Sequence, residues 1–197
     1  NLLFCVGWSH ILSKKILNIP KLLVVGHHPA ALPSNRGKHP LVWSIFLGLK
    51  ATASTFFLMD EGIDTGKIIN QRKILIKKNS PVINLYKKVQ KVLSTQIFEV
   101  IDDIIDKNYI LTSRYINRKT TRTRIIGNYW RKRDEHDGKI DFKMTSGAIL
   151  QLVNSLSKPY VGAHIEFEGK KCKVWKASID KKIKKNNIEP GKIIYKK

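Results

Sequence analysis

Two short apolar runs near the N-terminus constrain the fold more than any other feature of the sequence. They are Leu2–Val6 and Leu22–Gly26, and a helical stretch lies between them at Ile11–Leu17. A strand, a helix and a strand this close together predict a βαβ unit, with parallel strands and a right-handed crossover. Because neither run alternates with polar residues, both strands are expected to be buried on both faces. The sequence therefore predicts an α/β fold built on a parallel sheet.

The following residues continue the alternation of strands and helices. A loop at His27–Lys38 precedes a helix at Leu41–Leu47, and an apolar strand follows at Ala53–Met59. Ser80 and Pro81 resemble the cap and first residue of a long helix that ends near Lys107 and covers the sheet. In open α/β sheets, ligands bind at loops beyond the carboxyl ends of the strands. His28 and Asp64 both occupy such positions, so we expect their side chains to converge.

The second half of the chain has a different character. Residues 112–145 are basic and poor in aliphatic side chains, which predicts a linker between a domain at 1–111 and a second module at 146–197. That module is expected to be mostly β. It should contain a short helix at Ala148–Leu156, a hairpin formed by His164–Phe167 and Lys173–Ala177, and a strand that starts at Pro190. Because the chain opens and closes on strand-like runs, we expect both domains to be partial.

The net charge is +22, and it is distributed unevenly. Residues 1–109 carry 15 basic and 7 acidic side chains, whereas residues 110–197 carry 22 and 8. This excess fits either a polyanion-binding face or the Lys-, Asn- and Ile-rich composition of an AT-rich genome. No apolar run is long enough to cross a bilayer, so no membrane partner is expected. Cys5 and Cys172 lie far apart and outside any Cys/His cluster, which favours a reduced, cytoplasmic location and no metal site.

Two motifs at a fixed separation carry a family resemblance. Residues 26–37 read Gly-His-His-Pro-Ala-Ala-Leu-Pro-Ser-Asn-Arg-Gly, and residues 60–66 read Asp-Glu-Gly-Ile-Asp-Thr-Gly. They resemble the His-Pro-Ser-Leu-Leu-Pro-x-x-Arg-Gly and Asp-x-Gly-x-Asp-Thr-Gly signatures of folate-dependent formyltransferases. Residues 130–177 resemble the join between the two domains of methionyl-tRNA formyltransferases, with landmarks at 138–142, 159–160 and 173–177. The resemblance implies a Rossmann-like formyltransferase domain followed by a mostly β module.

The resemblance also implies a reaction and a set of site residues. A formyl group would pass from 10-formyltetrahydrofolate to a primary amine, with His28 as the base and Asp64 as the carboxylate that orients it. A histidine suits this role because its ordinary pKa lies near neutrality. Folate would lie beside two loops, in contact with Gly7, Ser9, Ile11, Leu12, Asp60 and Gly62. Arg36 and Gly37 would contact the acceptor. Arg36 could instead pair on the surface, Gly37 and Gly62 could serve only as turn residues, and Asp60 could merely cap its loop.

One position departs from the family pattern. The family usually carries an asparagine two residues before the catalytic histidine, where it donates a hydrogen bond to the oxyanion of the reaction; here this residue is Gly26. Loss of one such donor typically lowers the rate by about 10²–10³. His27 is a poor substitute, because adjacent side chains on a strand point to opposite faces. The donor would then be protonated His28 or a backbone N–H group.

The acceptor amine is the least constrained part of the hypothesis. Methionyl-tRNA is the first expectation, because of the second module and its positive charge, and an amino-sugar nucleotide is the alternative. A non-catalytic RNA-binding protein would explain the charge but not the spacing of His28 and Asp64. For a tRNA acceptor, the phosphates would contact lysines in and after the hairpin, which are Lys170, Lys171, Lys173, Lys181, Lys182, Lys184 and Lys185. Trp130 and Trp175 are expected to pack rather than to stack on bases.

Overall fold

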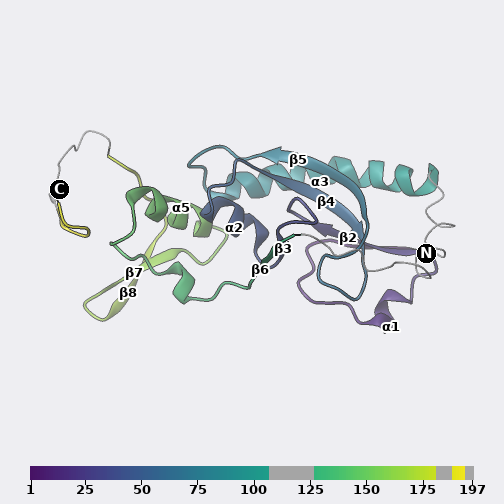
Figure 1. Ribbon diagram of the computed structural model, residues 1–197, viewed down its shortest axis with the longest axis horizontal. Helices are drawn as coiled ribbons and strands as arrows, with labels where there is room; N and C mark the ends of the chain where they lie inside the picture. Colours follow the sequence, from purple (N-terminus) through teal and green to yellow (C-terminus); the bar gives the residue numbers. More distant parts are fainter. Residues whose placement is uncertain (107–126, 181–187, 194–197) are drawn as a thin grey trace.

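The computed structural model describes residues 1–106, 127–180 and 188–193. A twisted four-stranded sheet occupies one end of the elongated molecule, and one long helix, α3, runs along it (Figure 1). The C-terminal elements α5, β7 and β8 lie at the other end. The α/β architecture expected from the sequence is confirmed, as is the largely β character of the C-terminal part.

The main sheet has the strand order β1-β2-β4-β5. Its strands are β1 (Leu2–Cys5), β2 (Leu23–His28), β4 (Ala51–Leu58) and β5 (Ile68–Leu75). β1 and β2 are parallel, which confirms the βαβ unit, but β2 pairs antiparallel with β4, and β4 with β5. The expectation that the strand before Asp64 is parallel to the strand before His28 is therefore wrong. An apolar run such as Ala51–Leu58 is equally apolar in both directions, so its pattern carries no information about strand direction.

Several predicted elements differ in detail from those observed. β1 is an edge strand of the sheet, so it is less buried than expected, and Leu3 is 39% exposed. The predicted helix at Ile11–Leu17 is a single turn, α1 (Lys14–Leu17). β5 was not predicted, because its centre is polar and exposed. The predicted helix at Leu41–Leu47 is α2 (Pro40–Phe46), and α3 spans Val82–Asp106 as expected.

α3 covers one face of the sheet and contributes two of the five buried residues of a hydrophobic core. Its residues Val100 and Ile104 pack against Leu23 and Val25 of β2 and against Phe56 of β4. Phe56, Val25 and Val100 are completely buried. The β2 side chains on this face therefore pack in the core. Those on the opposite face are available for other roles.

The chain after the gap at 107–126 returns to the first half of the molecule. β6 (Tyr129–Trp130) pairs in parallel with β3 (Arg36–Gly37), and a short 3-10 helix, η1, follows at His136–Gly138. α5 (Ser146–Leu156) begins at the cap residue Thr145, whose hydroxyl accepts a hydrogen bond from the Ala148 N–H group. α5 packs on α2 in a shared core of six buried residues: Val42, Ile140, Leu152, Val153, Leu156 and Ala163.

The hairpin at the C-terminal end is tighter than predicted. β7 (Ala163–Phe167) and β8 (Lys170–Val174) are joined by Glu168 and Gly169 alone, and both residues have positive φ angles, 49° and 71°. Such a two-residue turn matches the twist of the strands, so the second strand starts earlier than its sequence suggested. Pro190 and Gly191 form a turn, not the start of a strand.

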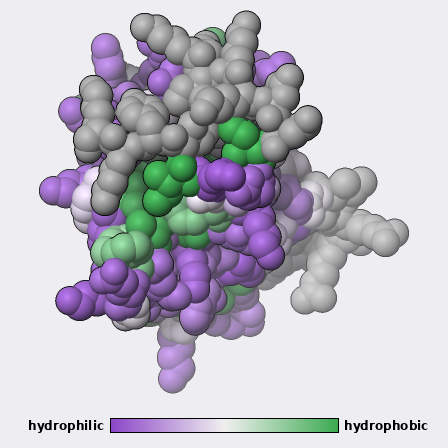
Figure 2. Space-filling model, turned by 90° about the vertical axis from the view of Figure 1, so that its left-hand side faces the viewer, coloured by the Kyte–Doolittle hydropathy of each residue, from purple (hydrophilic) through white to green (hydrophobic). Residues whose placement is uncertain are grey.

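Seen from the end where α5, β7 and β8 lie, apolar side chains form a patch within a largely hydrophilic surface (Figure 2).

Candidate active site

His28 and Asp64 lie together, as the sequence motifs predicted. His28 is the last residue of β2 and is only 5% exposed. Its Nδ1 atom lies 3.5 Å from Oδ2 of Asp64, which belongs to the loop between β4 and β5. Because β4 is antiparallel to β2, the two residues do not meet at a common strand edge. The β4–β5 loop folds back instead and carries Asp64 to the histidine.

The loop after β2 fixes the other side of the His28 ring. The Nε2 atom of His28 lies 2.8 Å from the carbonyl oxygen of Asn35. A carbonyl oxygen can only accept a hydrogen bond, so Nε2 carries a proton in this arrangement. In the neutral ring, Nδ1 is then the atom with the free lone pair. A proton that arrives at Nδ1 faces the Asp64 carboxylate, which stabilises the resulting positive charge.

Asp64 is held in place by the motif that contains Gly37. The same carboxylate oxygen that faces His28 accepts a hydrogen bond from the Gly37 N–H group at 2.9 Å. Gly37 has a φ angle of 97°, and a Cβ atom at this position would lie 2.3 Å from the Trp130 carbonyl oxygen. Only glycine fits there, because any side chain would collide with a backbone atom. Asp64 itself has a φ angle of 52°, a conformation that is uncommon for residues other than glycine and is frequent at functional sites.

Side chains of β4 and β5 support the buried loop that follows His28. The carbonyl oxygens of Pro29, Ala30 and Leu32 accept hydrogen bonds from the side chains of Thr52, Thr55 and Gln71, respectively. The distances are 3.3, 2.6 and 3.0 Å, and Gln71 also donates to the Thr55 hydroxyl at 2.9 Å. A buried loop needs partners for its backbone carbonyls, and these three side chains supply them. None of the three was identified from the sequence.

His27 points away from this site, as expected from strand alternation. Its Nε2 atom lies 2.8 Å from the Ser54 hydroxyl oxygen, and its ring centroid lies 5.0 Å from that of Phe56. Burial, assisted by the neighbouring His28, lowers the pKa of His27 to about 4. His27 is therefore neutral near pH 7 and belongs to the packed face under α3.

The space beside Gly26 is filled by apolar side chains. A Cβ atom at Gly26 would lie 2.8 Å from Cγ of Met59 and 2.9 Å from Cζ of Phe57. Phe57 is the cross-strand partner of Gly26 and is 3% exposed. Glycine thus stands where the family usually has an asparagine, and the side chains of Phe57 from β4 and Met59 from the following loop fill the space beside it. No side chain at position 26 can donate a hydrogen bond in this site.

The two loops that the resemblance assigns to folate lie on the same side of the molecule. Lys14, at the start of α1, forms an ion pair with Glu61 at 3.4 Å, and Lys38 donates to the Ser9 carbonyl. Gly7, with a φ of 68°, and Ser9 are exposed, Ile11 is 62% exposed, and Leu12 is buried. Asp60 accepts hydrogen bonds from the Gly62 N–H group and the Thr65 hydroxyl, at 2.9 and 2.6 Å, so it also caps its own loop.

Arg36 is held at the edge of the site by the returning chain. Its Nη2 atom donates to the Gly127 carbonyl at 3.4 Å, whereas its buried Nε atom has no hydrogen-bond partner. No sequence pattern pointed to Asn128, the second residue that contacts this loop. Asn35 could have been noticed, because asparagine tolerates the left-handed conformation that it adopts here, with φ 62°.

Across the described residues, no three His, Cys, Asp or Glu side chains cluster in a way that could hold a metal ion. Within the same part of the chain, no helix is long and apolar enough to cross a membrane. Trp130 is 7% exposed and stacks on Trp43, in agreement with the packing role expected for it.

Family comparisons agree with this geometry. The family described as formyl transferase matches residues 1–101, and the formyl transferase C-terminal domain matches residues 132–197. The chain belongs to the formyltransferase family. His28, Asp64 and the loops around them all lie in the first matched segment, whereas Asn128 lies between the two segments.

Individual relatives show how far the likeness extends. A methionyl-tRNA formyltransferase from Caldanaerobacter subterraneus is 28% identical over 97% of this formyltransferase-family chain, which spans 58% of that protein. The crystal structure of a 4-N formyltransferase from Francisella tularensis is 29% identical, with a TM-score of 0.69, over 88% of this chain and 69% of that chain. A sugar N-formyltransferase from a Shewanella species is 25% identical, with a TM-score of 0.65, over 91% and 71%.

Proposed function

We propose that the protein that carries this chain transfers a formyl group from 10-formyltetrahydrofolate to a primary amine. The observation that carries the proposal is the buried His28, whose Nδ1 atom lies 3.5 Å from Asp64 while Nε2 is held by the Asn35 carbonyl. A ring held in this way has one basic nitrogen. The Asp64 carboxylate can stabilise the positive charge that forms when this nitrogen takes up a proton. The family match over residues 1–101 supports the same reaction class.

His28 and Asp64 would act in sequence on one proton. Nδ1 of His28 takes the proton that the amine loses as its nitrogen attacks the formyl carbon. Asp64 stabilises the imidazolium. Because its two N–H groups face the Asn35 carbonyl and Asp64, the imidazolium offsets the negative charge that develops on the formyl oxygen by its positive charge, without a direct hydrogen bond. We assign this last task to His28 because position 26 has no side chain and the Gly37 N–H group already binds Asp64.

The folate ligand supplies the formyl group, and two features of the chain suit it. The loops at residues 7–13 and 60–64 are connected by the Lys14–Glu61 ion pair, and the first exposes Trp8 and Ile11, 61% and 62% respectively. These side chains offer apolar surface to a flat heteroaromatic ligand, and the backbone groups of the loop offer polar contacts. We therefore assign Gly7, Ser9, Ile11 and Leu12, together with Asp60 and Gly62, to the folate site. Arg36 and Gly37 are assigned to the acceptor side.

For the acceptor, we propose methionyl-tRNA. The name of the Caldanaerobacter relative and the excess of basic residues in the second half of the chain support this choice. An amino-sugar nucleotide is the second candidate, supported by the sugar N-formyltransferase among the structural relatives. Of the lysines expected to contact tRNA, Lys171 is paired with Glu135, and Lys181, Lys182, Lys184 and Lys185 lie outside the described residues.

The domain division stays part of this proposal. We retain a catalytic domain at 1–111, a linker at 112–145 and a C-terminal module from 146. The two family matches, which leave residues 102–131 between them, support a boundary in this region. In the middle of this linker, β6 pairs with β3, next to the candidate site.

The experiment is a formylation assay of the protein that carries this chain, with 10-formyltetrahydrofolate and either acceptor. His28→Ala and Asp64→Ala should each lower the rate by at least about 10²-fold, because each removes a group that acts on the transferred proton. His27→Gln is the matched control, since its side chain faces α3, and it should leave the rate nearly unchanged. Wild-type rates in both His28 and Asp64 variants would exclude the mechanism.

The same assay separates the acceptors. With tRNA, affinity should fall steeply as salt is raised, because binding releases counterions from many phosphates. A sugar nucleotide carries two phosphates and should show a much shallower salt dependence. Turnover of an amino-sugar nucleotide without tRNA formylation would select the second candidate. Binding of tRNA without turnover of any amine would select the non-catalytic reading.

A further inference from the structure

Asn128 binds the loop that holds His28, and both oxygen atoms of Asn128 take part. Its side-chain Oδ1 accepts a hydrogen bond from the Asn35 N–H group at 2.8 Å, and its backbone carbonyl accepts one from the Arg36 N–H group at 3.2 Å. Asn128 and Asn35 are 93 residues apart in the sequence. The contact therefore joins the middle of the linker to the core of the candidate site.

The peptide group between Asn35 and Arg36 transmits this contact to His28. Its N–H group donates to the Asn128 carbonyl, and its C=O group accepts from Nε2 of His28 at 2.8 Å. Hydrogen bonds at both ends of one peptide polarise each other and fix the plane of the peptide. The orientation of that plane determines whether a carbonyl oxygen faces Nε2, and hence which ring nitrogen of His28 carries the proton.

Asn35 needs an external support for this conformation. Its φ angle of 62° lies in the left-handed region, which is sparsely populated by residues other than glycine. Strained residues at functional sites persist only where the surroundings hold them. In this loop, Asn128 binds the N–H groups on both sides of the Asn35 Cα atom, so it supplies that restraint.

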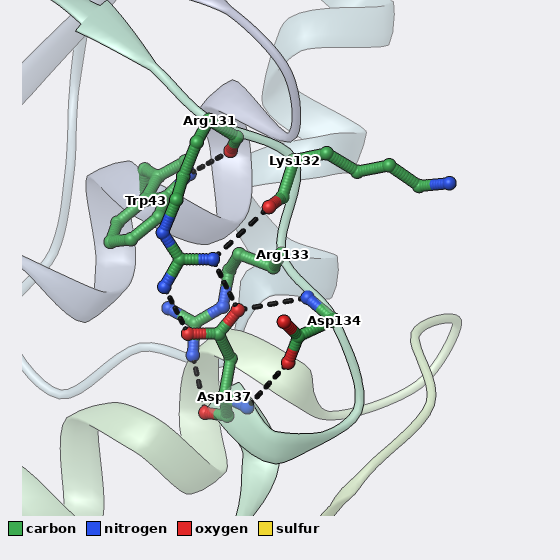
Figure 3. A network of polar contacts seen from close by, with 6 residues as sticks. All are labelled: Trp43, Arg131, Lys132, Arg133, Asp134 and Asp137. Carbon is green, nitrogen blue, oxygen red and sulfur yellow. Dashed lines mark hydrogen bonds and ion pairs between the residues drawn. The ribbon is translucent and has the colours of Figure 1, made fainter.

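The segment that carries Asn128 is itself firmly anchored on α2. We call residues 127–133 the strap. The Trp43 indole N–H donates to the Arg131 carbonyl at 3.1 Å, and the Arg133 guanidinium lies over both the Trp43 and Phe46 rings, 4.8 and 4.5 Å from their centroids. Asp137 accepts from Arg131 at 2.7 Å and its own carbonyl accepts from Arg133 at 2.6 Å (Figure 3). These cation–π contacts and hydrogen bonds hold the strap against the catalytic loop.

We propose that Asn128 is a positioning residue of the active site: its side-chain bond to the Asn35 N–H group holds Asn35 in the conformation whose carbonyl keeps the proton of His28 on Nε2, with Nδ1 toward Asp64. The inference rests on the proposed function for its consequence in turnover. The arrangement of hydrogen bonds can also be tested without turnover, because the tautomer of a histidine is directly observable.

The kinetic test compares two substitutions in the protein that carries this chain. Asn128→Ala removes the side-chain acceptor and should lower kcat by about 10-fold, in the range typical of residues that orient a functional ligand, while KM for folate changes less than about twofold. Asn128→Asp keeps an acceptor oxygen at the same place and should restore most of kcat. Asn154→Ala is the control, since it also removes an asparagine side chain that bonds to the backbone, here by donating to the Asn79 carbonyl at 3.1 Å, but touches none of residues 28–37, and kcat should not change.

A spectroscopic test keeps the two proposals distinguishable. In protein labelled with 15N-histidine at pH 9, His28 should be in the Nε2–H form, and Asn128→Ala should give a mixture of both tautomers, while Asn128→Asp retains the first. Assignment comes from the signal lost in His28→Gln. An unchanged tautomer in Asn128→Ala, or an Asn128→Asp protein as slow as Asn128→Ala, would overturn the role of Asn128. Full activity of His28→Ala would overturn the proposed function instead, whatever the tautomer.

Discussion

The two faces of the β2–β4 strand pair make different kinds of contact. On the face under α3, His27, Val25 and Phe56 pack among apolar side chains, and His27 is kept neutral. On the other face, His28 binds a backbone carbonyl and lies beside a carboxylate, and two of the residues around it, Asn35 and Asp64, have positive φ angles. The adjacent histidines therefore share a residue type and a strand but not a role.

This difference shows where the fold is rigid and where it stores strain. The α3 face gains its stability from burial of apolar side chains, which tolerates any arrangement that fills the space. The loop face depends on directional hydrogen bonds to backbone groups, and each of these specifies one orientation. Changes on the first face should affect folding, and changes on the second should affect the reaction.

The largest effect is expected at the centre of the packed face. Phe56→Ala should lower the free energy of unfolding by about 3–5 kcal/mol, because it removes a completely buried ring and leaves a cavity. Urea denaturation measures the change. Asp64→Asn, on the loop face, should lower stability by less than about 1 kcal/mol and still abolish most activity. Equal losses of stability in both variants would contradict the division between the faces.

The acid sensitivity of the fold should trace to His27. Its pKa is about 4 in the folded protein and about 6.5 when unfolded, so the unfolded chain binds a proton more readily. The contribution of His27 is complete above pH 6.5 and is lost as the pH falls toward 4, by an amount on the order of 3 kcal/mol or less.

Comparison of stability curves from pH 4 to pH 8 tests this expectation. His27→Gln keeps a hydrogen-bonding group for Ser54 but cannot be protonated in this range, so its stability should fall less steeply below pH 6.5. Parallel curves for the wild type and the variant would show that His27 is not the group responsible.

A smaller effect is expected at Gly26, which lies on the face of His28. Gly26→Ala should cost about 1–2 kcal/mol, because its Cβ atom would crowd the ends of the Phe57 and Met59 side chains. Phe57→Leu removes part of that contact. In the double variant, Gly26→Ala should therefore cost less than it does alone, with a coupling of about 0.5–1 kcal/mol in a double-mutant cycle. Strict additivity would mean that the space beside Gly26 is not filled by Phe57.

Much of this protein follows from its sequence, because the relevant signals are local. The run at Leu23–Val25, the short separation between the first two strands and the Ser80-Pro81 start of α3 each specify an element within a few residues. His28 and Asp64 could be identified because their motifs keep a fixed separation. The hairpin at residues 163–174 was predicted with a longer loop than it has, since the geometry of its two-residue turn depends on the register of both strands.

The tertiary structure decided what local patterns do not encode. The direction of β4 and the side chains that fill the space beside Gly26 depend on groups from other parts of the chain, and the Asn35 carbonyl that faces His28 is held by a residue from the second half. Asn128 is the clearest case, because nothing in its own neighbourhood indicates a partner 93 residues earlier. Periodicity reports which face of an element is buried, whereas the position of a hydrogen bond depends on where the whole fold places donor and acceptor.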